Sequence, residues 1–197
     1  MFHRARFLVS VALVVSAASM VQAQSCVWSL GGGISQPMGP DAQHFELGFN
    51  AGTDFFLYVS PNLLIGGHIA LNRWAPTTLF EQQPGIAPEN AITIYEIIPS
   101  ARISTAREFD LVNFFIQAGA GLYLKQQIPV SLDALTSKDF SDSLSFKRSI
   151  GVNVGAGIAL GDMNFMTVEI LPLYHYILKE EENLQYFSLG IGLSFRI

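Results

Sequence analysis

The chain has 197 residues, of which 50% are hydrophobic and 14% are charged, and its formal net charge is −5. Soluble globular domains carry about 25% charged residues, and nucleic-acid-binding domains present a basic patch. The composition therefore argues against an ordinary soluble domain and against a nucleic-acid partner. Downstream of the N-terminus, no apolar run reaches the roughly 18 residues that a membrane-spanning helix needs. A hydrophobic chain with few charges and no such run is typical of a transmembrane β-barrel.

Residues 1–23 have the pattern of a signal peptide. They combine a basic start, an apolar stretch over residues 7–18 and a small-residue cleavage site at 21–23. The apolar stretch is too short to span a membrane as a helix. We expect export, a mature chain that begins at Gln24, and one domain over residues 24–197.

Cys26 is the sole cysteine, which excludes an intrachain disulfide. A lipid-attachment site normally has a large aliphatic residue three positions before its cysteine, and this chain has Ala23 there. We therefore expect Cys26 to be an unmodified residue near the first strand.

Residues 186–197 alternate strictly between two kinds of side chain. One set is large and apolar, and the other is mostly glycine and serine, with Arg196 near its end. A period of two places these sets on opposite faces of a strand. The same alternation, interrupted by turn residues, predicts seven further strands. They are 27–36, 44–59, 63–73, 92–105, 111–125, 148–160 and 165–179.

The predicted connections alternate in length. Those after the second, fourth and sixth strands are short, whereas the loops at 75–91 and 126–147 are long. Outer-membrane barrels have short periplasmic turns and longer outer loops. We therefore predict an all-β, eight-stranded antiparallel up-and-down transmembrane β-barrel whose large apolar side chains face lipid. A soluble lipocalin-like barrel is the alternative, and it predicts apolar side chains inside. Pro99 predicts a bulge in the fourth strand.

Three glycine-rich segments carry a resemblance to a known family: GGGISQPMG at 31–39, AGAGLYL at 118–124 and GVNVGAGIAL at 151–160. Together with the alternation along the mature chain, they resemble the small outer-membrane β-barrel family of Gram-negative bacteria, the OmpA/OmpX-type porin-like proteins. The resemblance implies a barrel in outer-membrane lipid whose C-terminal strand is read by the barrel-insertion machinery. Members commonly end in an aromatic residue, whereas this chain ends in Ile197. We also expect a monomer without a cofactor.

Ionisable residues of both signs fall on the inward set of the predicted strands. They are Glu46, Asp54, Glu96, Arg102, Lys125, Glu169 and Arg196. Charges in a narrow interior are costly unless they are paired. We therefore expect a mixed-sign network that fills the barrel, and a gated narrow pore or proton path is the functional alternative.

His68 and His175 also point inward by parity. A histidine beside an acidic group can act as a general base, and some outer-membrane lipid-modifying enzymes share this barrel size. Neither IGGHIAL around His68 nor LPLYHYIL around His175 places a serine beside the histidine along the strand. No cluster of His, Cys, Asp and Glu has the spacing of metal ligands. We therefore expect neither catalysis nor a metal.

Two further features bear on function. Trp74, at the outer end of the third predicted strand, is the best candidate for an interfacial aromatic girdle, and we expect Phe45 to face lipid. A surface partner would bind the loops at 75–91 or 126–147. We therefore expect a structural or surface-interaction protein. A narrow small-solute porin and a membrane-embedded lipid-modifying enzyme are the alternatives.

Overall fold

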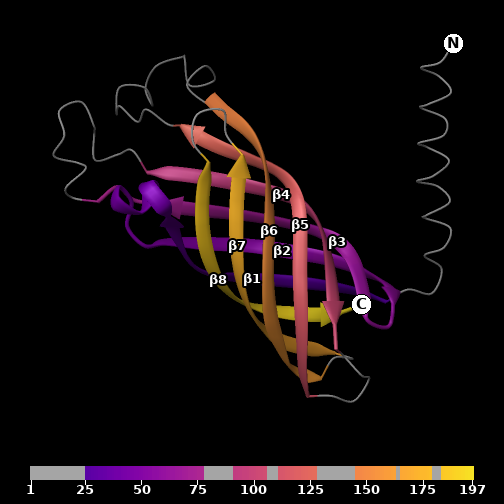
Figure 1. Ribbon diagram of the computed structural model, residues 1–197. Helices are drawn as coiled ribbons and strands as arrows, with labels where there is room; N and C mark the ends of the chain where they lie inside the picture. The colour runs from indigo at the N-terminus through magenta and orange to yellow at the C-terminus, as the bar shows by residue number, and fades with distance from the viewer. Residues whose placement is uncertain (1–24, 78–90, 106–110, 128–144, 163–164, 179–182) are drawn as a thin grey trace, which may run out of the picture.

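The structure is a computed structural model that describes residues 25–77, 91–105, 111–127, 145–162, 165–178 and 183–197. Eight strands form one closed barrel in chain order, each antiparallel to its neighbours, and β8 closes onto β1 (Figure 1). The strands are β1 (Cys26–Met38), β2 (Gly48–Ser60), β3 (Leu63–Trp74), β4 (Ile92–Ser104), β5 (Val112–Gln127), β6 (Ser145–Asp162), β7 (Met166–Leu178) and β8 (Leu184–Arg196). The predicted fold class is confirmed.

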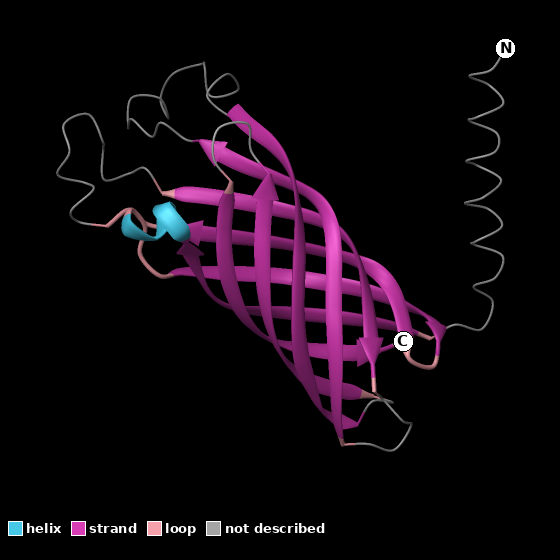
Figure 2. Ribbon diagram, in the orientation of Figure 1, coloured by secondary structure: helices cyan, strands magenta, loops and turns pink. Residues whose placement is uncertain are grey.

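The two ends of the barrel differ in their connections. The first residue of β1 and the last residues of β2, β4, β6 and β8 lie at one end, which we name the terminal end. The last residues of β1, β3, β5 and β7 lie at the other, the loop end, where the 3₁₀ helix η1 (Gly39–Gln43) also lies (Figure 2), and the two longest connections in the chain follow β3 and β5. Among the described residues, no helix has the length and hydrophobicity to cross a membrane.

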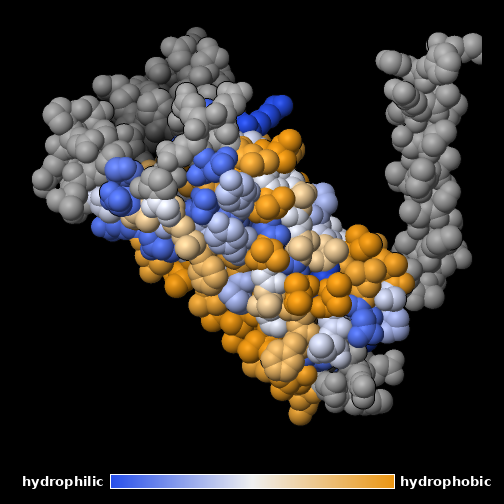
Figure 3. Space-filling view, in the orientation of Figure 1, coloured by the Kyte–Doolittle hydropathy of each residue, from blue (hydrophilic) through white to orange (hydrophobic). Residues whose placement is uncertain are grey.

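The large apolar rows point outward along the strands, as the alternation predicts. Leu30, Ile69, Phe114, Val154 and Ile191 are all exposed. Figure 3 shows apolar residues covering much of the visible wall, while hydrophilic ones gather near the loop end. Because a lipocalin-like barrel would have its apolar rows inside, this orientation excludes that alternative.

Glycine on the inward rows lets neighbouring strands approach closely. A Cβ atom on Gly33 would lie 1.9 Å from the Leu189 carbonyl oxygen, and one on Gly66 would lie 1.8 Å from the Phe55 carbonyl oxygen. A side chain at either position therefore requires the backbone to move. The glycine patterns in the sequence reflect this packing between strands.

Three predictions about the strands are wrong. β2 begins at Gly48 rather than at residue 44, because the chain first passes through η1. Phe45 consequently does not face lipid: it is half-buried and packs against apolar residues at the loop end. Pro99 makes no bulge, since its register with β3 is continuous and only its pairing with β5 is interrupted. A register shift does occur in β2, between Tyr58 and Ser60.

Trp74 is not a girdle residue. Its side chain is 1% exposed, and its indole Nε1 donates a hydrogen bond to the Ser35 carbonyl oxygen at 3.0 Å inside the barrel. Its even number places it on the same face of β3 as His68 and Asn72, which are also buried. Its position at the end of a strand suggested the membrane interface. The alternation of side chains along β3 instead directs it into the barrel.

Candidate functional site in the barrel interior

Apolar side chains fill both ends of the barrel interior. At the loop end, seven buried residues form one cluster, the loop-end cluster: Trp74, Ile94, Ile98, Tyr123, Ile177, Leu184 and Tyr186. Toward the terminal end, two smaller clusters consist of Val27, Phe56 and Leu64, and of Phe115, Ala159, Leu171 and Leu173. An eight-stranded barrel is only wide enough for its side chains to fill. These clusters confine the polar interior between them.

Glu96 is the centre of the polar interior. Its side chain is fully buried, and Oε1 accepts short hydrogen bonds from Asn72 Nδ2 and Tyr186 Oη. The donors come from β3 and β8, whereas Glu96 belongs to β4. A buried carboxylate is tolerated only when such partners stabilise it.

His175 lies against the other oxygen of Glu96. Its Nδ1 is 3.3 Å from Glu96 Oε2, and its Nε2 is 3.1 Å from Ser188 Oγ. The imidazole also stacks on the Tyr186 ring, with 4.2 Å between ring centroids and 8° between planes. The ring is therefore held in one orientation by contacts on its face and at both nitrogens.

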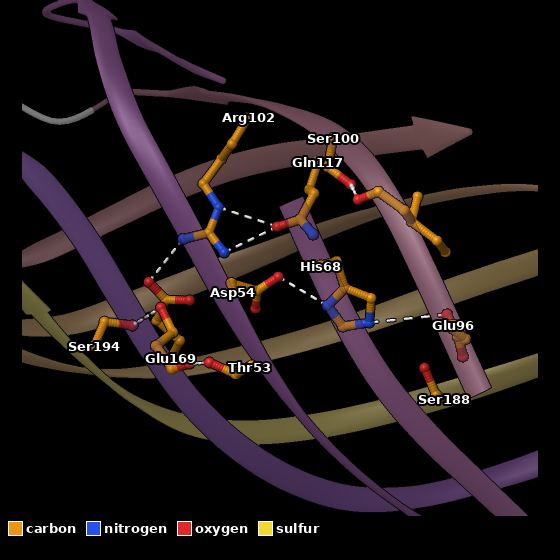
Figure 4. A network of polar contacts seen from close by, with 12 residues as sticks. Thr53, Asp54, His68, Glu96, Ser100, Arg102, Gln117, Glu169, Ser188 and Ser194 are labelled. Atoms are coloured by element: carbon orange, nitrogen blue, oxygen red, sulfur yellow. Dashed lines mark hydrogen bonds and ion pairs between the residues drawn. The ribbon is translucent and has the colours of Figure 1, made fainter. Parts of the chain in front are cut away.

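His68 connects two carboxylates. Its Nδ1 lies 2.8 Å from Asp54 Oδ1, and its Nε2 lies 3.8 Å from Glu96 Oε2 (Figure 4). Asp54 and His68 are directly paired across β2 and β3. Since an ionised carboxylate only accepts hydrogen bonds, the close contact with Asp54 favours an imidazole with a hydrogen on Nδ1.

Arg102 forms a second polar cluster nearer the terminal end. Its Nη1 lies 2.7 Å from Glu169 Oε1, and its Nε and Nη2 donate to Gln117 Oε1 at 3.1 and 2.9 Å. Its guanidinium carbon is 4.6 Å from the Phe56 ring centroid and 4.2 Å from that of Phe115. Charge-assisted hydrogen bonds and cation–π contacts together stabilise this buried charge.

Both polar clusters join opposite walls of the barrel. Glu96 and Arg102 belong to β4, and their partners His175 and Glu169 belong to β7. In the closed sheet, β5 and β6 separate these strands on one side and four strands separate them on the other. The contacts therefore span the lumen, and we name the pairs Glu96–His175 and Arg102–Glu169 the cross-lumen pairs.

The structure separates the seven residues that the sequence indicated as an interior charge network. Asp54, Glu96, Arg102 and Glu169 lie in the two polar clusters. Lys125 is half-buried near the loop end of β5. Arg196 lies near the terminal end, where its guanidinium carbon is 5.2 Å from the Tyr58 ring centroid.

Glu46 does not belong to the interior. It is exposed and precedes Gly48, the first residue of β2, so the parity of that strand does not extend to it. Sequence reasoning also missed neutral members of the clusters, namely Asn72, Gln117 and Tyr186. Only their inward parity could have indicated them.

Ser188 is a further residue that the sequence did not connect with His175. No serine lies beside His175 along β7, but β8 brings Ser188 to its Nε2. Ser188, His175 and Glu96 thus follow the order of a serine–histidine–acid triad. Their exposed fractions are 6%, 1% and 0%, so all three side chains are buried.

A cavity of about 70 Å³ lies beside these residues. Asn72, Glu96, His68, His175 and Ser188 contribute to its polar side. Glycines of β1, β2 and β8 form much of the remaining wall: Gly31, Gly52, Gly190 and Gly192. Within the described ranges, no group of three or more His, Cys, Asp and Glu residues is arranged to hold a metal ion.

Neither a family model nor a curated protein matches the sequence. Solved structures do match the fold. Neisserial surface protein A (NspA) has 16% identity and a TM-score of 0.63, over 88% of this chain and 97% of that chain. The N-terminal β-barrel domain of Pseudomonas aeruginosa OprF has 12% identity and a TM-score of 0.53, over 88% and 97%.

The attachment invasion locus protein Ail of Yersinia pestis, solved with the heparin analogue sucrose octasulfate, has 14% identity and a TM-score of 0.53, over 89% of this chain and 100% of that chain. These proteins are eight-stranded outer-membrane β-barrels. The similarity concerns the fold, and it confirms the resemblance to small outer-membrane barrels.

Proposed function

We propose that this chain is an exported, monomeric outer-membrane protein with a structural or surface-interaction role. The observation that carries this proposal is the filled lumen: apolar clusters occupy both ends and the cross-lumen pairs connect opposite walls. Such an interior favours a rigid support for external loops over a solute channel. The outward apolar rows favour a position in lipid.

Two similar structures agree with a surface role. NspA is called a surface protein, and Ail an attachment invasion locus protein that was solved with a heparin analogue. On this proposal, the connections after β3 and β5 carry the interaction. Epitope tags inserted at 78–90 and 128–144 should be accessible to antibody on intact cells, whereas a tag in the turn after β4 should not. Labelling of only that turn would reverse the orientation and contradict the proposal.

Single-channel recording in planar bilayers tests the closed lumen. The folded wild-type protein should insert without conductance steps, because side chains fill both ends. A variant that combines Arg102→Ser, Phe56→Ala and Phe115→Ala should also show no steps, because it empties the terminal end only and the loop-end cluster still fills the other end. Steps from the wild type would instead support the small-solute porin.

Export and assembly can be tested separately. Mass spectrometry of protein from an outer-membrane fraction should give Gln24 as the N-terminal residue after cleavage of residues 1–23. Recognition by the barrel-insertion machinery should involve β8, so Ile197→Phe should assemble at least as fast as the wild type. Slower assembly of Ile197→Phe would contradict this role of the C-terminal residue.

A further inference from the structure

The central cavity has walls of two kinds. Asn72 in β3, Glu96 in β4 and His175 in β7 contribute polar atoms to its lining, and Gly190 of β8 belongs to the glycine-rich part. The volume of about 70 Å³ exceeds the roughly 10–15 Å³ that a single water molecule requires. The cavity is therefore large enough for water.

Two buried acceptors beside the cavity have no hydrogen-bond partner in the protein: Glu96 Oε2 and Asn72 Oδ1. The two residues are 0% and 1% exposed. The imidazole nitrogens of His175 and His68 lie 3.3 and 3.8 Å from Glu96 Oε2, but neither makes a hydrogen bond to it. Buried acceptors in folded proteins are nearly always satisfied, and leaving one unpaired is unfavourable.

We propose that this cavity is a binding site for water, which donates hydrogen bonds to Glu96 Oε2 and Asn72 Oδ1. A cavity holds water when it is polar and gives the molecule two to four polar partners. Ser188, which also borders the cavity, supplies a hydroxyl that both donates and accepts. Water can match this mixed set of donors and acceptors, whereas an ammonium ion only donates. The carboxylates of Asp54 and Glu169 also line the cavity, so ammonium is tested as the alternative occupant.

The bound water completes the polar cluster around Glu96. The direct contacts of Glu96 Oε1 lead to Asn72 and Tyr186, and water at Oε2 adds a connection to the cavity wall formed by β8. The water site lies in the barrel interior, so its occupancy does not depend on whether the loops bind a partner.

Gly190 offers a variant that fills the cavity and leaves its polar groups intact. A Cβ atom there would lie 3.7 Å from the nearest atom, the Leu171 carbonyl oxygen, which is an ordinary contact distance. Gly190→Val should therefore displace the water, and Gly190→Ala should displace part of it. Ala120→Val is the matched control, because Ala120 is exposed on the outer face of β5.

The experiment uses the full folded chain, perdeuterated and in detergent micelles, with nuclear Overhauser effects from water to amide and imidazole protons. The wild type and Ala120→Val should show long-lived water contacts at Ser188 and at the His175 ring, and Gly190→Val should lose them. If Gly190→Val does not fold, a reduction of these contacts in Gly190→Ala gives the same result. Absence of the contacts in the wild type, or their persistence in a folded Gly190→Val, overturns the proposal.

Exchange of sodium chloride for ammonium chloride distinguishes water from a cation. If water occupies the site, the ¹³C resonance of the Glu96 carboxylate should not respond to this exchange at constant pH. A saturable shift of that resonance with ammonium, absent in Gly190→Val, would identify a cation site and overturn the assignment to water.

Discussion

Arg102 in β4 and Glu169 in β7 meet across the barrel lumen, with 2.7 Å between Arg102 Nη1 and Glu169 Oε1. Both side chains are almost completely buried. Nε and Nη2 of the same guanidinium donate hydrogen bonds to Gln117 Oε1. The pair connects two strands that are not neighbours in the sheet. It therefore opposes flattening of the barrel cross-section. Backbone hydrogen bonds connect only neighbouring strands and do not bridge the lumen.

Removal of one partner should be more damaging than removal of both. Arg102→Met leaves Glu169 as an uncompensated buried charge, and we expect a loss of about 3–5 kcal/mol in the free energy of unfolding. Arg102→Met combined with Glu169→Met should recover a large part of that loss, because replacing a whole buried pair by apolar groups is often nearly neutral. Urea unfolding in lipid vesicles, followed by tryptophan fluorescence, measures both.

Arg73→Met is the control for this cycle, because Arg73 is an exposed arginine on β3. Its free energy of unfolding should change by no more than about 0.5 kcal/mol. A double variant as unstable as Arg102→Met alone would show that the pair is not coupled.

The two tryptophans should report opposite environments. Trp28 is 39% exposed on the outer wall, whereas Trp74 is 1% exposed inside the loop-end cluster. In vesicles with brominated acyl chains, the fluorescence of Trp28 in a Trp74→Phe protein should be strongly quenched. The fluorescence of Trp74 in a Trp28→Phe protein should be quenched much less. Equal quenching would contradict the inward position of Trp74 and restore the girdle interpretation.

Adjacent glycines in β3 should respond differently to alanine. A Cβ on Gly66 would lie 1.8 Å from the Phe55 carbonyl oxygen, whereas one on Gly67 would lie 3.9 Å from its nearest neighbour, the Ile98 carbonyl oxygen. Gly66→Ala should therefore destabilise the barrel by about 1–3 kcal/mol. Gly67→Ala should be neutral or stabilising by up to about 1 kcal/mol, because the unfolded chain loses entropy. The urea midpoints of the two variants give the comparison, and equal midpoints would contradict it.

Parity in the sequence predicted the wall of the barrel well, because one alternation determines the face of every residue in a strand. It placed Asp54, His68 and Glu96 inside, and the structure has His68 and Glu96 buried there with Asp54 in contact with His68. It failed for Glu46 and Phe45, where the predicted strand started too early. For Trp74, parity gave the right direction, but the residue type suggested the wrong one.

Register was not available from the sequence, and register decides which inward residues meet. Asp54 pairs with His68, and Arg102 pairs with Gln117, because those residues are opposite each other on neighbouring strands. The contact between His175 and Ser188 depends on the register of β7 with β8. The cross-lumen pairs also require the stagger of the whole closed sheet, which no local pattern contains.

The serine–histidine–acid arrangement in the lumen leads to a final prediction. Ser188 Oγ lies 3.1 Å from His175 Nε2, so its geometry alone is compatible with nucleophilic catalysis. A catalytic serine must also be reached by its substrate, and the exposed fraction of Ser188 is 6%. We therefore expect no labelling of the folded protein by a lipid-soluble fluorophosphonate. We also expect mass spectrometry to detect no fatty acid released from lipid A or phospholipid. Labelling that disappears in Ser188→Ala, while the exposed-serine variant Ser60→Ala keeps it, would establish the enzyme alternative instead.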